Sequence, residues 1–440
     1  MVDTSQEETG LGNYFVANYP PFSSWKATYL PEAEAALNCE PKPGTPLGLY
    51  LHIPFCRKRC KFCYFRVYTD KNARDVETYI EALVKEVELY SRRPIVGARP
   101  LQYVYFGGGT PSYLSVSQLK ILRDRLHRHI SWDQAEEVTF ECEPGTLQQH
   151  KLEALKDLGV TRLSLGIENF NDHILEANGR AHLSAEIFRA YGWARDLSFD
   201  QINIDLIAGM VGESWDNWRD CVQKTIELNP DSVTIYQMEL PFNTVFSKEL
   251  PVAGEAATPS AIADWPTKRD WVNYAFDTLS SAGYEISSAY TMVKDLRRCR
   301  FLYRDSLWHG ADMFGTGVAS FGHANGVHMQ NVDTWEQYVG MVLDKGDLPL
   351  GRALPVSRRA LMIREMILQL KTGRIESGYF RRKFDTDVLD IFGDRFGSME
   401  DQGFALRENG TVKLTRRGLM QVDRLLPNFF EPEYRGSRYT

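Results

Sequence analysis

Residues 50–65 read Tyr50-Leu-His-Ile-Pro-Phe-Cys-Arg-Lys-Arg-Cys-Lys-Phe-Cys-Tyr-Phe65, an apolar run that leads into three closely spaced cysteines. These are Cys56, Cys60 and Cys63, in Cys-x3-Cys-x2-Cys spacing. Three thiolates on one tight loop can hold three corners of a cubane iron–sulfur cluster. The remaining cysteines are scattered along the chain, so one iron is left open to another ligand. An open iron is what S-adenosylmethionine (SAM) requires if it is to be reduced and cleaved.

Two other interpretations of the cysteines are weaker. A zinc site completed by His52 or another residue is the first, but structural zinc sites usually show two paired knuckles, and the sequence holds no second Cys/His pair. A disulfide is the second, and three clustered cysteines cannot all pair. The spacing therefore favours an iron–sulfur cluster over zinc.

Composition excludes several classes of protein. The chain has 440 residues, a net charge of −7 and seven cysteines, too few for a disulfide scaffold. Its N-terminus is acidic and lacks the basic and apolar regions of a signal peptide, and no apolar run approaches the length of a membrane span. We therefore expect a cytoplasmic protein without a transmembrane segment. The negative charge gives no general drive toward nucleic acid.

Strand-like and helix-like stretches alternate from about residue 47 to residue 294, which predicts an α/β fold with a parallel sheet and crossover helices. Six or more such units can curl into a full or partial barrel, with functional groups on the loops at the carboxyl ends of the strands. The predicted strands are 47–53, 101–106, 136–143, 160–167, 201–208 and 232–240. The predicted helices are 74–93, 115–130, 146–158, 183–197 and 214–229.

The chain divides into four predicted regions. Residues 1–45 form an N-terminal extension, 46–295 the barrel, 296–355 a linking and substrate-covering region, and 356–440 a small C-terminal module. Residues 241–264, rich in Pro, Gly and Ala, predict a long loop. In the last region, helical runs precede alternating apolar residues around Asn409-Gly410, which predicts a hairpin and a winged-helix-like module. Its basic residues are offset by acids, which favours packing over binding of nucleic acid.

A second motif, Phe106-Gly-Gly-Gly-Thr-Pro111, ends the second predicted strand. Consecutive glycines let the backbone approach a ligand closely and expose its hydrogen-bonding groups. A tight strand-to-helix turn is the plainer interpretation. Because the motif follows the cysteine loop by one strand, Gly107, Gly108, Gly109 and Thr110 are candidates to hold the methionine end of SAM.

Carboxylates occupy strand ends where a core strand would be apolar. Such groups are costly to bury unless they are paired or bound to a ligand. Arg180 could pair with Glu168 or with a ligand carboxylate, although a surface ion pair is nearly as good an explanation. We expect these carboxylates to line one pocket, namely Glu141, Glu143, Glu168 and Asp205.

Five motifs follow one another in the order seen in radical SAM enzymes. They are the cysteine motif from Tyr50, Gly-Gly-Gly-Thr-Pro from Gly107, Glu-x-Glu-Pro-Gly from Glu141, Leu-Gly-Ile-Glu-Asn-Phe-Asn-Asp from Leu165 and Asn-Ile-Asp-Leu-Ile-Ala-Gly from Asn203. The chain resembles most closely the family of the oxygen-independent coproporphyrinogen III oxidase, with its heme chaperones and radical methyl and methylene transferases. This resemblance covers residues 47–240 well and 356–430 more loosely. It implies a partial (β/α)6-type radical SAM barrel.

The resemblance also implies roles for individual residues. Cys56, Cys60 and Cys63 would bind a [4Fe-4S] cluster, whose fourth iron takes the amino and carboxylate groups of SAM. Tyr50 and Glu168 are the candidates for a catalytic role. The cofactor-binding set implied for SAM is Tyr50, Phe62, Gly107, Gly108, Gly109, Thr110, Glu141, Glu168, Arg180 and Asp205.

The implied chemistry is reductive cleavage of SAM to a 5′-deoxyadenosyl radical that takes a hydrogen atom from the substrate. An electron donor such as flavodoxin or ferredoxin is implied with it. Two departures from the family weaken the expectation of a coproporphyrinogen III decarboxylase, since Phe65 replaces a further cysteine and Glu168 a glutamine. The heme motif of the chaperones corresponds to Tyr303–Trp308, where only the tryptophan is retained. His309, which follows, is conceivable as an axial heme ligand.

Two basic clusters bear on the substrate. One surrounds the cysteines, from Arg57 to Arg66, and the other comprises Arg297, Arg298 and Arg300. They either compensate the negative charge of a cluster or attract an anionic substrate. Three functions stay open: a radical enzyme acting on a tetrapyrrole, a methyl or methylene transferase that uses a second SAM, and a heme chaperone with little turnover.

Overall fold

The computed structural model describes residues 14–241, 243–249 and 262–436. Residues 1–13 of the expected N-terminal extension, part of the expected loop 241–264 and residues 437–440 lie outside the described residues. The main sheet has 12 strands in the order β12-β11-β10-β9-β1-β2-β3-β4-β5-β6-β8-β7. A second sheet has 3 strands in the order β13-β15-β14.

Six parallel strands form the centre of the main sheet, and they follow the predicted stretches closely. Each strand pairs in parallel with the next along the chain. Parallel strands joined by crossover helices curl into a barrel, and the predicted α/β partial barrel is confirmed. The strands are β1 (Leu47–Ile53), β2 (Tyr103–Gly108), β3 (Glu137–Cys142), β4 (Arg162–Glu168), β5 (Gln201–Ala208) and β6 (Ser232–Gln237).

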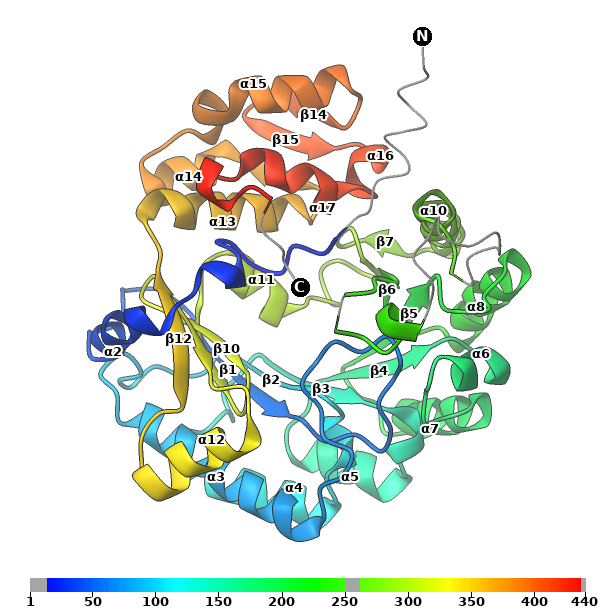
Figure 1. Ribbon diagram of the computed structural model, residues 1–440. Coiled ribbons are helices and arrows are strands. Elements are labelled where there is room, and N and C mark those ends of the chain that lie inside the picture. Colours follow the sequence, from blue (N-terminus) through cyan, green and yellow to red (C-terminus); the bar gives the residue numbers. More distant parts are fainter. Residues whose placement is uncertain (1–13, 242, 250–261, 437–440) are drawn as a thin grey trace.

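The crossover helices lie on the outside of the strands (Figure 1). Local sequence sets their starts: Asn72 and Ser115 each form a capping box with the residue three positions on, at α3 and α4. No helix among the described residues is long and apolar enough to cross a membrane. The crossover helices are α3 (Ala73–Ser91), α4 (Val116–Leu126), α5 (Gln149–Asp157), α6 (Asp172–Ala177), α7 (Ser184–Asp196) and α8 (Trp215–Leu228). After β6 come α9 (Phe246–Glu249), whose first N–H donates to the Lys61 carbonyl of the cysteine loop, and α10 (Trp265–Ser281).

The region 296–355, expected to link and to cover substrate, contributes strands to the main sheet. β9 pairs in parallel with β1 on the side opposite β2, and β10, β11 and β12 continue the sheet in antiparallel order. At the far edge, β8 pairs antiparallel with β6, and β7 pairs antiparallel with β8. These elements are β7 (Glu285–Ile286), β8 (Thr291–Val293), α11 (Leu302–Trp308), β9 (Asp312–Thr316), β10 (Phe321–Ala324), β11 (Val327–Asn331), α12 (Trp335–Val339) and β12 (Leu350–Pro355).

Helix α11 lies at the amino-terminal ends of the barrel strands. The backbone N–H groups of Leu302 and Tyr303 donate to the carboxylate of Glu137, the first residue of β3, at 2.7 and 3.2 Å. The cysteine loop follows the carboxyl end of β1. Helix α11 therefore closes the end of the barrel opposite the cysteines.

The C-terminal module packs helices around the small sheet, and Figure 1 shows it in orange and red beside the barrel. Its hairpin joins β14 and β15 through Asn409 and Gly410, whose φ angles are 49° and 78°. Positive φ at both central residues is the type I′ geometry that Asn-Gly predicts. The elements are α13 (Arg358–Leu370), β13 (Arg374–Glu376), α14 (Ser377–Phe384), α15 (Val388–Asp401), β14 (Ala405–Glu408), β15 (Thr411–Leu414), α16 (Arg416–Leu419) and α17 (Val422–Leu425).

The N-terminal segment, which includes α2 (Leu30–Leu37), joins the module to the barrel. Lys371 and Asp423 of the module form a fully buried ion pair of 2.8 Å. Lys371 Nζ also donates to the Val16 carbonyl at 2.6 Å, and the Val16 N–H donates to Asp423 at 2.9 Å. One residue before, the Phe15 N–H donates to Glu239 beyond the end of β6 at 2.7 Å. A buried ion pair and the hydrogen bonds around it thus hold together three parts of the chain that are distant in sequence.

A buried carboxyl joins α3 to the β9–β12 part of the sheet. Glu86 accepts hydrogen bonds from the Gly317 N–H, the Asn331 side-chain amide and the Tyr338 hydroxyl, each at 2.7 Å. Its side chain is fully buried, and burial raises its pKa to about 8 despite these donors. The folded protein therefore holds a proton on Glu86 at pH values where the unfolded chain has lost it.

This raised pKa predicts a pH dependence of stability. An unfolded glutamate titrates near pH 4.3, so between about pH 4.3 and 8 the folded state binds one more proton at this position. The free energy of unfolding should fall as pH rises through that window, by up to about 1.4 kcal/mol per pH unit from this group. In Glu86→Gln this contribution disappears, and the urea midpoint should depend less on pH than in the parent protein.

The matched control is Glu81→Gln on the same helix, because the Glu81 side chain is 57% exposed. Urea unfolding at pH 5, 6, 7 and 8 gives the slope of the free energy of unfolding against pH for the parent protein and for each of the two variants. Equal slopes in the parent protein and in Glu86→Gln would contradict the assignment.

Candidate functional site

The three cysteines lie on one loop at the carboxyl end of β1, and each is a free thiol that is partly exposed. The Thr110 hydroxyl donates to Cys56 Sγ at 3.3 Å, and Arg180 Nη1 donates to Cys60 Sγ at 3.3 Å. A turn from the Cys63 N–H to the Cys60 carbonyl, at 3.1 Å, shapes the loop. Burial raises the pKa of Cys56 to about 11 and that of Cys63 to about 12. Ionising these thiols requires a positive centre beside them, which bound iron supplies.

His52, the residue considered for a zinc site, has another partner. Its Nδ1 lies 3.1 Å from the Tyr50 hydroxyl, and burial lowers its pKa to about 4. Its ring packs against Gly108, where an added Cβ would come within 2.6 Å of the imidazole. Within the described ranges, no three His, Cys, Asp or Glu side chains are placed to bind a single ion.

The glycine motif packs against the backbone that leads into the cysteine loop. The Gly109 N–H donates to the Ile53 carbonyl at 2.9 Å, and the Thr110 N–H donates to the Phe55 carbonyl at 2.8 Å. A Cβ on Gly109 would lie 2.9–3.0 Å from backbone atoms of residues 53–55. Close packing inside the protein therefore accounts for a glycine at this position, and the motif holds the start of the cysteine loop in place.

Three of the predicted carboxylates meet at the strand ends. Glu141 accepts from the Tyr105 hydroxyl at 2.6 Å and from the Gly108 N–H at 3.2 Å. Asp205 accepts from Ser164 and Asn203, each at 2.9 Å. Burial raises the pKa of Glu141 and that of Glu168 to about 7, and neighbouring carboxylates add to this effect. Burial also raises the pKa of Asp205, although Arg162, Ser164 and Asn203 oppose it. Clustered carboxyl groups of this kind favour a ligand that carries positive charge or hydroxyl groups.

Glu168 reaches the site through an unusual backbone. Its φ is 68°, a conformation that costs about 1–3 kcal/mol for such a residue, and it lies at an irregularity in the β4–β5 pairing. Its Oε1 is 3.6 Å from Arg180 Nη1, which confirms the predicted pair. Arg180 Nη2 also donates to the Gly166 carbonyl at 2.5 Å, and its buried Nε has no partner in the described part of the chain.

Arg180 thus contacts a cysteine and a carboxylate at once. Its free N–H is directed at no protein acceptor, so it is available to a ligand carboxylate. A molecule with cationic groups and a carboxylate matches these surroundings, and SAM carries a sulfonium, an ammonium and a carboxylate. The residues present therefore fit both a cluster on the cysteines and SAM beside it.

Glu143 is not part of this pocket, contrary to expectation. Arg57 forms two hydrogen bonds with its carboxylate, at 3.0 and 3.1 Å, and His182 lies at 3.1 Å. Burial raises the pKa of Glu143, but His182 and Arg57 outweigh it and lower that pKa to about 2. Glu143 stays ionised and holds the cysteine loop against the barrel.

Phe62 packs with its partly buried side chain against a small apolar cluster at the ends of β5 and β6. That position is compatible with the adenine contact expected for it, which concerns its backbone. The cluster consists of Ile174, Ile207, Met210 and Met238, with Leu240 beside it.

Several inward-facing residues escaped sequence reasoning. The Tyr105 ring stacks on Tyr50 at 5.9 Å and lies 4.3 Å from the Tyr303 ring. Arg162, almost fully buried, lies over the Phe301 ring at 4.2 Å, and its Nε and Nη1 have no partner in the described part of the chain. Alternate residues of a strand face the same side, so counting back two residues from a strand end, as from Gly107 to Tyr105, finds the other inward positions. This alternation is the sequence signal that could have identified them. Tyr303 comes from α11, so no local pattern could place it there.

The second basic cluster does not lie at the site. Arg297, Arg298 and Arg300 follow β8, whose Val293 pairs with Ser232, the first residue of β6. They are therefore exposed at the amino-terminal end of the barrel, away from the cysteines. The sequence could not show this because β8 runs antiparallel to the barrel strands.

His309 is engaged in packing. Its Nδ1 lies 2.6 Å from the Asp305 carbonyl, and its ring meets the edge of Tyr379 at 5.3 Å. Its backbone carbonyl also accepts from Lys383 at 2.6 Å. These contacts join α11 to the C-terminal module and account for the histidine without heme.

Known proteins match both the sequence and the fold. The Radical SAM superfamily profile matches residues 50–224. The oxygen-independent coproporphyrinogen III oxidase of Synechocystis sp. is 28% identical over 439 residues, which cover 94% of this chain and 91% of that protein. The heme chaperone HemW of Bacillus subtilis is 27% identical over 379 residues, which cover 84% of this chain and 95% of that protein. The solved structure of coproporphyrinogen III oxidase (HemN) from Escherichia coli is similar, with a TM-score of 0.82 and 22% identity. That match covers 97% of this chain and 98% of the other.

The packing of Gly109 leads to a prediction for the cysteine loop. In Gly109→Ala the new Cβ must displace backbone atoms of residues 53–55, at a cost of about 1–3 kcal/mol, and Cys56 is the next residue. We expect the variant to incorporate less iron and sulfide on anaerobic reconstitution. Gly192→Ala is the control, because a Cβ there meets no atom within 4 Å. Equal iron content in both variants would contradict the role of Gly109.

Proposed function

We infer the function of this chain from the family to which it belongs, the coproporphyrinogen III oxidase-like family of the radical SAM superfamily, which also holds heme chaperones. We propose that it binds a [4Fe-4S] cluster through Cys56, Cys60 and Cys63, cleaves SAM reductively and abstracts hydrogen from an anionic substrate related to tetrapyrroles. When bound, the reduced cluster supplies the electron that cleaves SAM to methionine and a 5′-deoxyadenosyl radical.

One observation carries the proposal. The Arg180 guanidinium lies 3.3 Å from Cys60 Sγ and 3.6 Å from Glu168 Oε1. The cysteine loop and the carboxylates, which are far apart in sequence, are therefore parts of one site. A cluster alone would not need clustered carboxylates, and a ligand pocket alone would not need three thiols.

The residues of the site have separate tasks in this proposal. Thr110 and Arg180 donate to the cysteine sulfurs and offset the negative charge of the thiolates. Arg180 Nε binds the carboxylate of SAM, and the backbone beside Gly108 with Glu141 binds its ammonium group. Asp205 and Glu168 take the hydroxyl groups of the ribose, and Phe62 lies beside the adenine.

The aromatic side chains keep water from the reacting atoms. Tyr50, Tyr105 and Tyr303 pack on one another inside the barrel, and burial raises the pKa of each phenol, so all three are neutral at physiological pH. In this proposal the packed rings limit the access of solvent to the SAM site. In this role Tyr50 and Glu168 touch the cofactor directly, which is why we propose them as catalytic residues.

The oxidase-like relatives support a tetrapyrrole substrate, since the match covers nearly the whole of both chains. A heme chaperone is the second candidate, because HemW of Bacillus subtilis is matched over 95% of its length. The packing of His309 gives no support to heme ligation at that residue. We therefore favour a reaction on the substrate, with a flavodoxin or a ferredoxin as the one-electron donor.

The first test is cleavage of SAM. With dithionite under anaerobic conditions, the reconstituted protein should form 5′-deoxyadenosine, and a Cys56→Ala, Cys60→Ala, Cys63→Ala triple variant should form none, since the iron has lost its ligands. Cys39→Ala, which removes an exposed cysteine elsewhere, should keep the activity. A triple variant that still cleaves SAM would refute the assignment. S-adenosylhomocysteine as an additional product would indicate methyl transfer and a second SAM.

The second test separates the oxidase from the chaperone. Anaerobic turnover with coproporphyrinogen III should consume the substrate together with SAM, with chromatography of the porphyrins as the measurement. Stoichiometric heme binding without consumption of SAM would instead favour the chaperone.

A further inference from the structure

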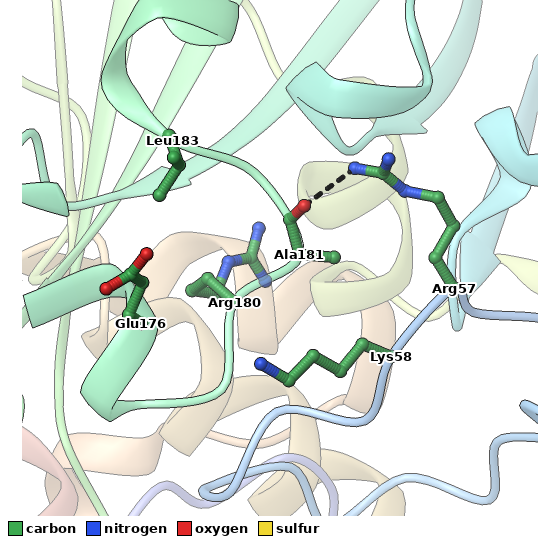
Figure 2. Close-up of a pocket in the computed structure, with 6 residues that line it drawn as sticks. All are labelled: Arg57, Lys58, Glu176, Arg180, Ala181 and Leu183. Carbon is green, nitrogen blue, oxygen red and sulfur yellow. Dashed lines mark hydrogen bonds between the residues drawn. The ribbon is translucent and has the colours of Figure 1, made fainter. Parts of the chain in front are cut away.

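His182 is a fully buried histidine between the cysteine loop and the carboxylate site, and the proposed function gives it no role. It lies two residues after Arg180, just before α7 begins at Ser184. Figure 2 shows how the cysteine loop approaches this segment: the Arg57 guanidinium donates to the carbonyl of Ala181, the residue before His182, at 2.9 Å. Arg57, Arg180 and Ala181 also line a surface pocket of about 350 Å³, whereas the His182 side chain is closed off from solvent.

Both ring nitrogens of His182 face oxygen atoms. Nδ1 lies 3.1 Å from Glu143 Oε1, and Nε2 lies 3.2 Å from the Ile167 carbonyl oxygen. A carbonyl oxygen only accepts, and Glu143 is ionised because its carboxylate already accepts from Arg57 and from the Gly145 N–H at 2.9–3.1 Å. A neutral imidazole has one N–H, whereas an imidazolium has two. Both contacts are therefore hydrogen bonds only if His182 carries two protons and a positive charge.

The surroundings of the ring act on its charge in both directions. Burial lowers the pKa of His182, and Arg180 acts in the same direction, whereas Glu143 and the Ile167 carbonyl raise it. In either neutral form, a nitrogen lone pair would face an oxygen atom inside the protein, and that repulsion favours the charged ring. The charged groups on the elements around the ring are the acids Asp172, Glu143, Glu168 and Glu186 and the cations Arg57 and Arg180.

The Ile167 carbonyl belongs to the strained turn that carries Glu168. The Asn169 N–H donates to this carbonyl at 2.9 Å, and Glu168 lies between them with a φ of 68°. A hydrogen bond that spans two residues, with a positive φ at the central one, forms a γ-turn of the rare and strained kind. His182 adds a second donor to the same carbonyl, and Arg180 donates to the carbonyl one residue earlier. This segment therefore holds the turn on which Glu168 reaches the site.

We propose that His182 carries two protons and acts as a positioning residue that couples the two halves of the site. Its Nδ1–H binds Glu143, which Arg57 ties to the cysteine loop, and its Nε2–H binds the turn that carries Glu168. The inference rests on the proposed function, which assigns cofactors to the cysteines and to Glu168. The charged ring is present at low pH, and the loss of one ring proton as pH rises leaves one of the two acceptors without its donor. One half of the site is then free to move relative to the other.

The first experiment measures the protonation of His182 in the full-length protein before reconstitution, so that no cofactor is needed. Nitrogen-15 NMR of protein with labelled histidine shows whether each ring nitrogen carries a proton, and the signals lost in His182→Gln identify this residue. At pH 7 both nitrogens should be protonated. In Glu143→Gln the ring should hold one proton, because the new amide can donate to Nδ1.

Glu186→Gln is the matched control, because it removes the same charge from a side chain that binds the Leu183 N–H instead. It should leave both ring protons in place. A single ring proton in the parent protein, or the same state in Glu143→Gln as in Glu186→Gln, would overturn the proposal.

The second experiment measures 5′-deoxyadenosine formation with dithionite against the concentration of SAM in the reconstituted protein. In His182→Gln, whose amide can replace only one of the two bonds, the KM for SAM should rise about tenfold. The kcat should stay within about threefold, because the lost bond touches no reacting atom. His309→Gln is the matched control, since that ring donates to the Asp305 carbonyl beside the C-terminal module, and it should leave the KM unchanged.

An equal KM in His182→Gln and in the parent protein would overturn the coupling. If His182→Gln does not fold or takes up no iron, the ring protons of the parent protein and of Glu143→Gln still decide the proposal. No cleavage of SAM by the parent protein would refute the proposed function itself, and the NMR result, which needs no cofactor, would still stand.

Discussion

The burial of like charges beside the cysteine loop is the constraint on which the site depends. Glu141, Glu168 and Asp205 lie together in the barrel, where burial raises the pKa of each carboxyl group and neighbouring carboxylates raise those of Glu141 and Glu168 further. Cations make this arrangement favourable: Arg162 acts on Glu141 and Asp205, and Arg180 pairs with Glu168 while contacting Cys60. The left-handed backbone of Glu168 is retained because the surrounding contacts hold it. A cofactor with its own cationic groups completes the balance of charge in the proposed complex.

The same physical principle holds the larger parts of the fold together. Lys371 and Asp423 are paired without exposure to water, and both bind the backbone of Val16. Glu86 gathers donors from three separate segments under the β9–β12 part of the sheet. A buried ion pair or carboxyl group that loses its hydrogen-bonding partners is strongly destabilising, so each of these groups admits only one arrangement of its neighbours. The barrel, the module and the N-terminal segment are positioned by contacts that tolerate little displacement.

Much of the barrel could be predicted because its signals are local. Apolar runs and amphipathic stretches predicted all six parallel strands, and the Asn409-Gly410 turn predicted the hairpin of the module. Sequence patterns did not reveal the features that depend on distant pairing. Residues 296–355 join the main sheet through β9, and Arg297, Arg298 and Arg300 lie at the end opposite the cysteines. Glu143 was expected in the same pocket as Glu141, yet its buried carboxylate is bound by Arg57 and His182 instead.

The sequence by itself determined the chemical groups, since the cysteine spacing, the glycine motif and the strand-end carboxylates are all properties of short stretches. Tertiary structure alone decided which of them meet. The contact of Arg180 with Cys60 spans 120 positions of the chain, and Tyr303 reaches Tyr105 from a helix at the far end of the barrel. The reason is that local periodicity specifies which face of a strand is buried. The distances between strand ends depend instead on the curvature of the sheet and on the packing of every crossover helix.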